Sequence, residues 1–367
     1  FGPAVVPVPL HNKPRKKSCS GSEYAEYGYI GDAINLFLAD SCQVAAGDHV
    51  FVLANGLSIT YGQINRLAGE FYGTTNPISD GKTTPEQSAR FIAAYKALAG
   101  SRFRQPAEAQ DILAVLQVEV NAVNDALHRG EDPSDAYRNL PDMTEKLEAL
   151  TQARPYGLPT YTGLARINWD SFGSDARTAY DAGHALALQT AAAGKLEEAY
   201  MLNAFADSYL VRCFSAGYLR TPRRSLHLAA VADLAAHACA KFMHTEEAYL
   251  GLFVSNPAGE RWVVYGSERA LEEAARDNLQ RCVAAVQASI DEVYAAFTTK
   301  DIVAQNDYKA WIIAPVSASI WQEKNFAPLF KCRDGVSKDL LRRQDIGNRR
   351  KNHYTKDWTP QSTAIAC

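Results

Sequence analysis

The sequence predicts a mainly α-helical fold, in which one multi-helix domain carries a small β-hairpin and irregular arms at both ends. Apolar residues recur three and four positions apart over most of residues 22–297, which is the period of amphipathic helices. Only one segment within this stretch has a strand-like composition. We therefore expect an extended arm over residues 1–21, a single helical domain over residues 22–330, and an irregular basic arm over residues 331–367.

The first helices are predicted from periodicity and capping residues. Residues 22–42 place Ile34, Phe37 and Leu38 on one face, so we expect one helix there. Thr60 and Gln63 form a capping-box pattern at the start of the next helix. A third helix follows over residues 84–99, with Thr84 as its cap, Pro85 in its first turn and Gly100 as its stop.

A long helix is predicted over residues 106–130, where apolar residues form a continuous stripe. Residues 174–297 read as almost unbroken helix, with Gly173, Gly194 and Gly217 as terminators. Between the last two helices, the stretch "LFVSNPAGERWVVYG" surrounds an Asn-Pro-Ala-Gly turn and predicts the hairpin.

Composition argues against a disordered chain and against a general nucleic-acid binder. The chain of 367 residues is 47% hydrophobic and has a net charge of -3, so it can fill a core and is too near charge balance for a general nucleic-acid binder. The basic stretch "NKPRKK" in the first arm could contact anionic lipid or nucleic acid, but we expect it to be solvated.

The seven cysteines leave at least one without a disulfide partner. A Cys19–Cys42 or a Cys332–Cys367 bridge would suit a secreted protein, whereas a reduced cytoplasmic chain could carry the same number. We favour secretion and keep a soluble cytoplasmic location as the alternative.

Four motifs resemble the zinc-dependent phospholipase C and single-strand nuclease superfamily, in its bacterial and fungal branch. They are "ITYGQINRLAGEFYG", "INWDSFGSDARTAYDAGHALAL", "NAFADSYLVRCFSAGYLRTPRR" and "FMHTEEAYLGLFVSNPAGERWVVYG", in the same order along the chain. The resemblance implies an all-α fold in which histidines and carboxylates hold three zinc ions, and a metal-activated water cuts phosphodiester bonds.

The residues at the implied ligand positions have changed. Where relatives read A-D-H-x-L-x-D-x-F-x-x-G-H, this chain has Ser208, Arg212 and Tyr218. Ser171 and Tyr27 likewise stand where the resemblance implies histidine. Hydroxyl and phenol groups bind zinc poorly at neutral pH, and guanidinium would repel it. The resemblance thus implies the fold without the three-zinc cluster, as in a pseudoenzyme.

An inherited pocket lined by Tyr27, Ser171, Ser208, Arg212 and Tyr218 would be rich in hydrogen-bond donors and carry a fixed positive charge. Its expected ligand is a small anion, such as phosphate, sulfate, carboxylate or a phospholipid headgroup. The alternative is that Ser208, Arg212 and Tyr218 have only structural roles, on the surface or in the core of the helical domain.

We expect no cofactor. The alternative is zinc or another single divalent metal, held by Glu70 and His244 with Glu246 or Glu247 as a third ligand. Glu70 stands where relatives have aspartate, although a solvated glutamate in a last helical turn is the default.

Other charged residues are expected to be structural. His184 should fill a packed helix face, His227 and Glu246 should lie on the surface, and the arginines of "YLRTPRR" should be solvated. They are Arg220, Arg223 and Arg224.

Two functions follow as hypotheses. We favour a non-hydrolytic relative that binds a small anionic or phosphorylated ligand, or serves only as a scaffold. The alternative is an active metal-dependent phosphoesterase on phospholipid or nucleotide, with a rearranged site around Glu70, His184 and His244. A third hypothesis is peripheral contact with a lipid surface through the basic N-terminal arm.

Overall fold

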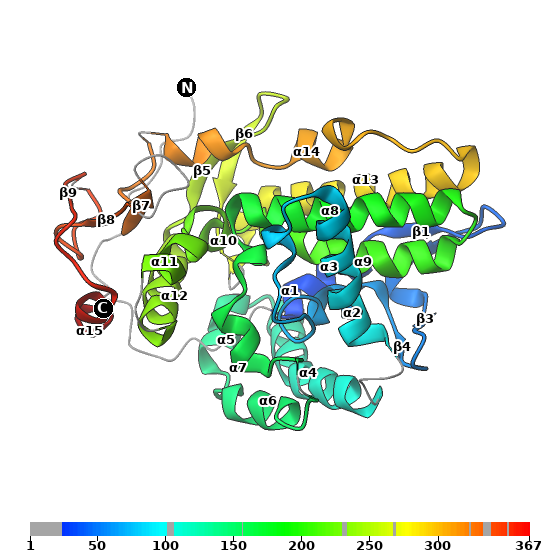
Figure 1. The fold of residues 1–367 in the computed structure, drawn as a ribbon, viewed down its shortest axis with the longest axis horizontal. Coiled ribbons are helices and arrows are strands. Elements are labelled where there is room, and N and C mark those ends of the chain that lie inside the picture. The colour runs from blue at the N-terminus through cyan, green and yellow to red at the C-terminus, as the bar shows by residue number, and fades with distance from the viewer. Residues whose placement is uncertain are drawn as a thin grey trace.

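The computed structural model describes residues 24–100, 106–155, 157–229, 233–266, 269–322, 324–332, 339–350 and 352–367 (Figure 1). The N-terminal arm predicted over residues 1–21 lies outside the described residues, and so do Cys19 and the basic stretch. The described chain is mainly α-helical, with small separate sheets.

Three long helices form the centre of the molecule: α8 (Gly173–Ala192), α9 (Leu196–Arg212) and α13 (Arg276–Thr299). Every residue of α9 from Leu202 to Arg212, and the turn beyond it, is almost completely buried. A helix that is buried all round must satisfy its polar side chains through other protein groups. Polar residues on α9 are therefore either structural or functional, and none is simply solvated.

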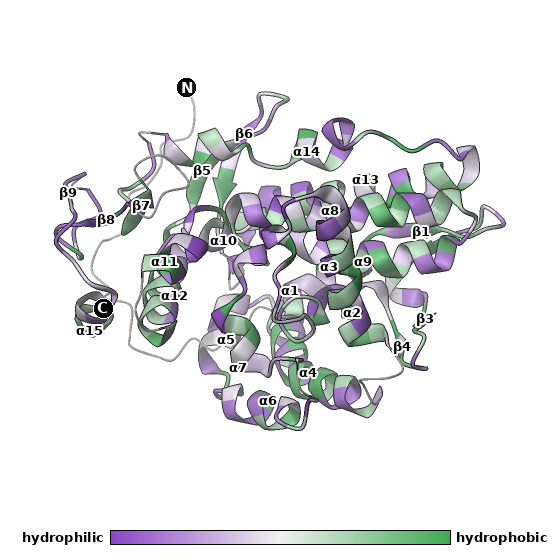
Figure 2. Ribbon diagram, in the orientation of Figure 1, coloured by the Kyte–Doolittle hydropathy of each residue, from purple (hydrophilic) through white to green (hydrophobic). Residues whose placement is uncertain are grey.

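Shorter helices surround this centre, and α1 and α2 pack against each other beside α9. In Figure 2 hydrophilic and hydrophobic residues alternate along the outer helices, as expected where one side faces the core. These helices are α1 (Tyr24–Asp32), α2 (Tyr61–Leu67), α3 (Thr84–Ala99), α4 (Pro106–His128), α5 (Pro133–Asn139), α6 (Thr144–Thr151), α7 (Tyr161–Arg166), α10 (Ala216–Arg220), α11 (Arg223–Ala229), α12 (Asp233–Leu250) and α14 (Lys309–Ile313).

The single helix predicted over residues 22–42 is wrong beyond its first half. The chain leaves α1 at Asp32 and forms β1 (Asn35–Phe37), which pairs antiparallel with β2 (Gln43–Ala45). The side chain of Gln287 on α13 hydrogen-bonds both backbone groups of Asn35, with N···O distances of 2.9 and 3.0 Å. This tertiary contact favours the strand over the local helical pattern.

Other local predictions are confirmed or shifted slightly. The Thr60/Gln63 capping box is present, and α4 has the predicted extent. The cap of α3 is Thr83 instead of Thr84, and Gly217 lies inside α10 instead of ending a helix. Within the stretch predicted as almost unbroken helix, the last long helix begins at Arg276.

The predicted hairpin is confirmed as β5 (Leu252–Ser255) paired with β6 (Arg261–Val264). A further small hairpin, which the sequence did not predict, joins β3 (Phe51–Val52) to β4 (Ser58–Ile59).

The C-terminal segment, predicted to be irregular, is ordered in its described part. It forms a three-stranded sheet of β7 (Phe330–Cys332), β8 (Leu340–Arg343) and β9 (Tyr354–Thr355), followed by α15 (Pro360–Ala366) on α12. Arg343 and Arg349 both bind the Glu246 carboxylate of α12, at N···O distances of 2.9 and 2.5 Å. Glu246, predicted to lie on the surface, is buried because these arginines cover it.

The structure also bears on the cysteines and on whether any helix could cross a membrane. Cys367 is a free thiol, so the Cys332–Cys367 bridge, one of the two pairings considered for a secreted protein, does not form. Cys332 Sγ lies 3.3 Å from Ser225 Oγ. Within the described ranges, every helix is too short or too polar to cross a membrane.

Candidate functional site

The guanidinium of Arg212, at the end of α9, lies at the centre of the predicted site. Its side chain is fully buried, and Nη1 donates to the carbonyl oxygen of Ser208 at 2.7 Å. Nη2 donates to the Ala68 carbonyl at 3.1 Å and to Glu70 Oε1 at 3.4 Å. Nε has no hydrogen-bond partner among the described residues. A buried donor without a partner is costly, so this cluster is incompletely satisfied.

Aromatic rings enclose the same guanidinium. Its central carbon lies 5.1 Å from the ring centre of Tyr27, 5.6 Å from that of Tyr209 and 5.8 Å from that of Tyr218. Burial alone would lower the pKa of Arg212, but Tyr27, Glu70 and the other phenols more than offset burial and raise it. Arg212 is therefore a permanent buried cation.

Glu70, Tyr218 and His244 complete the cluster. Tyr218 Oη donates to Glu70 Oε1 at 3.4 Å, and the His244 ring stands edge-on to Tyr218 with 4.5 Å between ring centres. Burial lowers the pKa of His244 to about 4, so its imidazole is neutral at pH 7. Glu70, expected by default to be solvated, is mostly buried because it pairs with Arg212.

The backbone brings Glu70 to Arg212 through a tight turn after α2. Gly69 has a φ of +76°, and a Cβ there would lie 3.3 Å from Tyr209 and 3.4 Å from Arg212 Nη2. Only glycine takes this conformation without strain. A Cβ at Gly217 would lie 2.5 Å from the His244 ring, so glycine is required there too.

Ser208 is not part of the cluster through its side chain. Its hydroxyl donates to the Phe205 carbonyl one turn back at 2.8 Å. Its backbone carbonyl, and not its hydroxyl, meets Arg212.

Ser171 lines a neighbouring hollow of about 370 Å³, a volume that includes the open mouth. Gly69 and Tyr209 are also among its lining residues, and both lie close to the Arg212 guanidinium. Burial raises the pKa of Asp170, another lining residue, to about 6, although it accepts hydrogen bonds from Ser79. The structure thus places Ser171 in the lining of this hollow, beside the cluster around Arg212.

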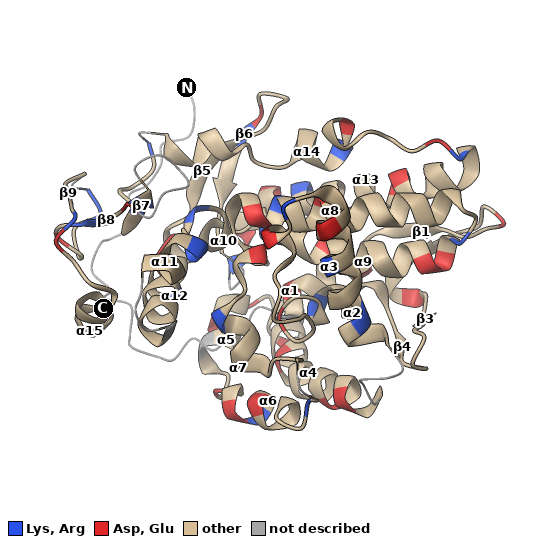
Figure 3. Ribbon diagram, viewed as in Figure 1, with Lys and Arg blue, Asp and Glu red and all other residues tan. Residues whose placement is uncertain are grey.

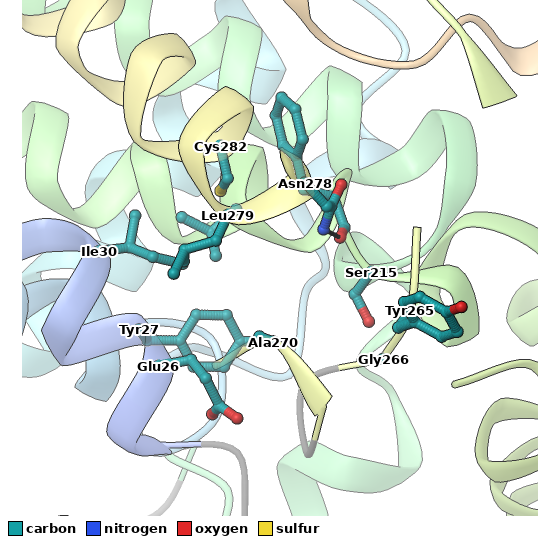
Figure 4. A pocket seen from close by; sticks show the side chains of 12 residues that line it. Glu26, Tyr27, Ile30, Ser215, Tyr265, Gly266, Ala270, Asn278, Leu279 and Cys282 are labelled. Atoms are coloured by element: carbon teal, nitrogen blue, oxygen red, sulfur yellow. Dashed lines mark hydrogen bonds between the residues drawn. The ribbon is translucent and has the colours of Figure 1, made fainter. Parts of the chain in front are cut away.

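A second hollow, of about 350 Å³ with its mouth, lies on the Tyr27 side of Arg212. Figure 4 shows Tyr27 and Ile30 of α1 on one side of it and Leu279 and Cys282 of α13 on the other. The buried hydroxyl of Ser215, which also lines it, has no hydrogen-bond partner among the described residues. Arg212 itself lines neither hollow, but Tyr27 and Tyr209, whose rings flank its guanidinium, line one hollow each.

Arginines already engage both candidates for the third ligand of the alternative metal site, Glu246 and Glu247. Arg343 and Arg349 bind Glu246, and Arg220 binds Glu247 at 2.9 Å through each of two nitrogens. Within the part of the chain that the structure describes, there is no group of three His, Cys, Asp or Glu side chains arranged to hold a metal ion. At the implied zinc positions, the serine, arginine and tyrosine do not fit zinc.

The arginines of "YLRTPRR", predicted to be solvated, instead hold segments together. Arg220 is buried against Glu247, and Arg223 donates to Asn168 and to the carbonyl of Arg166. Arg224 pairs with Asp175 at 3.0 Å and also with Asp80. Figure 3 shows basic and acidic residues together where α10 and α11 meet the start of α8. His227, also predicted on the surface, is partly buried against Trp169.

A buried polar network between α2, α8, α9 and α13 was not predicted, although His184 was expected to be packed. Asn203 donates to Tyr61, Asp207 and Ser289 at 2.9–3.2 Å, and Asp207 accepts from Tyr61 and Ser289 at 2.6 and 2.8 Å. The His184 ring nitrogens face Asn203 at 2.7 Å and Glu292 at 3.1 Å. The "N-x-x-x-D" spacing on a small-residue helix was the only sequence signal for it.

Three members of this network have the distances of a serine-histidine-glutamate triad. Ser289 Oγ lies 3.4 Å from His184 Nδ1, and Glu292 lies 3.1 Å from Nε2. However, His184 and Ser289 are completely buried, and neither lines the two hollows. The network therefore joins helices α2, α8, α9 and α13, and its histidine and serine are closed to solvent.

Comparison of the chain with protein-family models, with curated proteins and with solved structures gives no match. The likeness to phospholipase C therefore rests on the sequence motifs.

Proposed function

We propose that this chain is a non-hydrolytic relative of zinc-dependent phospholipase C, and that its altered site binds a small anionic or phosphorylated ligand. The observation that carries this proposal is the buried guanidinium of Arg212, at a position where the resemblance implies a zinc-binding aspartate. The proposal has two parts, the loss of zinc chemistry and the gain of an anion site.

The loss of zinc chemistry is supported by charge. Arg212 keeps its proton at every pH at which proteins fold, and a dication beside it would be repelled. Tyr218 would have to lose a proton that a phenol keeps to about pH 10 before it could bind metal well. The hydroxyl of Ser208 faces its own helix.

The anion site is supported by the donors that Arg212 and Tyr218 present. Both already bind one anionic oxygen, that of Glu70, at 3.4 Å. The Nε of Arg212 remains as a further donor. Arginine in such a setting binds phosphate and carboxylate through charge-assisted hydrogen bonds.

Metal content and hydrolysis test the first part. We expect fewer than one zinc per chain after incubation with excess zinc and removal of free metal, and no chelator-sensitive hydrolysis of bis(p-nitrophenyl) phosphate. Two or three bound zinc ions, or hydrolysis abolished by chelation and by His244→Ala, would overturn the proposal. That result would instead favour the phosphoesterase hypothesis, for which Glu70 and His244, both in contact with Tyr218, are the candidate ligands.

Phosphate titration tests the second part. We expect calorimetry to detect inorganic phosphate binding to the wild type and to find it at least tenfold weaker in Arg212→Met. Arg281→Met removes an arginine of a surface pair and is the matched control, which should bind like the wild type. Equal affinity in all three proteins would leave the site as a structural scaffold only.

A further inference from the structure

The ion pair between Glu70 and Arg212 is longer than the other buried ion pairs in the described part of the chain. Its N···O distance is 3.4 Å, whereas Arg220 and Glu247 approach to 2.7 Å and Arg343 and Glu246 to 2.9 Å. Charge-assisted hydrogen bonds normally measure about 2.7–2.9 Å. Glu70 therefore holds Arg212 weakly for a buried pair.

Only one partner of this pair reaches solvent. The side chain of Glu70 is 13% exposed and that of Arg212 is 0% exposed, whereas Arg220 and Glu247 are both completely covered. Glu70 also lies on the turn between Gly69 and Gly73, outside any helix. Its carboxylate can therefore leave Arg212 and become hydrated without unfolding a helix.

Both contacts of Glu70 use the same oxygen, Oε1. One carboxylate oxygen thus serves two donors, while Arg212 Nε has no partner among the described residues. A phosphate group carries more acceptor oxygens than a carboxylate and can serve more donors at once. The position that Glu70 Oε1 fills is chemically suited to a phosphate oxygen.

We infer that Glu70 is an internal competitor at the Arg212 site, and that a phosphate monoester or inorganic phosphate binds by displacing its carboxylate. The inference rests on the proposed anion-binding function and adds its regulation: the affinity of the site is set by how strongly Glu70 holds Arg212.

Removal of the Glu70 charge should therefore strengthen anion binding. In calorimetric titration with inorganic phosphate at pH 7, we expect Glu70→Gln to bind at least tenfold more tightly than the wild type. Glu260→Gln removes the carboxylate of the exposed pair with Arg281 and is the matched control, which should leave the affinity unchanged. Glu70→Ser provides a second variant if the glutamine destabilises the fold, and it should also bind more tightly.

The outcomes separate the two proposals. If Arg212→Met abolishes binding but neither Glu70 variant strengthens it, the anion site stands and the competitor role of Glu70 is overturned. If neither the wild type nor any variant binds phosphate, both proposals fail.

Co-sedimentation with phosphatidic acid vesicles, against phosphatidylcholine vesicles, distinguishes a lipid phosphate from the free ion. Binding to neither vesicle, with phosphate binding intact, assigns the site to a free phosphate compound.

Discussion

Helix α9 carries two buried polar clusters in consecutive turns, and they differ in how completely their hydrogen bonds are satisfied. Asn203 and Asp207 belong to a network in which each has at least three protein partners. Arg212 lies about one turn further on. Its hydrogen bond to Glu70 is long, at 3.4 Å, and its Nε has no hydrogen-bond partner among the described residues.

If Arg212 binds an anion as proposed, this difference is what separates a structural cluster from a binding site. A network whose polar groups are all hydrogen-bonded gains nothing from a ligand. Removing one member of it leaves several buried groups without partners. A loosely satisfied cation beside a partly exposed carboxylate can exchange that carboxylate for another anion. Burial alone, which the two clusters share, would not have distinguished them.

Of the changes to the two clusters on α9, the largest effect on stability is expected at Asn203. Asn203→Ala removes the amide that connects Tyr61, Asp207, Ser289 and His184, and leaves buried polar groups around a small cavity. We expect a loss of about 4 kcal/mol in the free energy of unfolding.

Chemical denaturation measures this loss. Asn121→Ala on the exposed face of α4 is the matched control and should cost less than about 0.5 kcal/mol. A loss below about 1 kcal/mol at Asn203 would mean that the network does not hold the helices together.

A smaller effect should appear in the pH dependence of stability. Burial raises the pKa of Asp207 to about 7, although hydrogen bonds from Tyr61 and Ser289 and the nearby His184 oppose this. The folded state thus holds this proton more tightly than the unfolded chain does. The contribution of Asp207 to stability is complete below about pH 4 and is lost as the pH rises through 7.

The variant Asp207→Asn carries no titrating group at this position. The wild type should lose on the order of 3 kcal/mol relative to it between pH 4 and pH 8. Urea denaturation across this range measures the difference. Asp277→Asn, at an exposed position, should leave the wild-type slope unchanged. If the difference in free energy of unfolding between wild type and Asp207→Asn is the same at all pH values, folding does not raise the pKa of Asp207.

The helical class was predictable because a period of three to four residues needs no tertiary information. The strand at Asn35 was not, because Gln287, far away in sequence, selects it. The C-terminal sheet was missed for a similar reason. Its basic residues look solvated in sequence, but Arg343 and Arg349 find a buried partner in Glu246 on α12.

The candidate site was predictable in part. The family resemblance singled out Arg212, Tyr218, Tyr27, Glu70 and His244, and the structure places them in one cluster. Ser208 was misjudged because its hydroxyl bonds its own helix, an alternative open to any helical serine. The sequence could not show that Glu70 neutralises Arg212, since a turn containing Gly69 at positive φ brings it there.

The smallest effect on stability is expected at the candidate site around Arg212. Arg212→Met leaves Glu70 without its cation, but Glu70 is partly exposed and can be hydrated, so we expect a loss of only about 1 kcal/mol. Arg220→Met is the matched comparison. It strands the Glu247 carboxylate where no solvent reaches it, and this should cost about 3–5 kcal/mol. Thermal and urea denaturation of both variants test the contrast. Equal losses would mean that Arg212 is a structural ion pair like Arg220, and that the looseness of its contacts has no functional meaning.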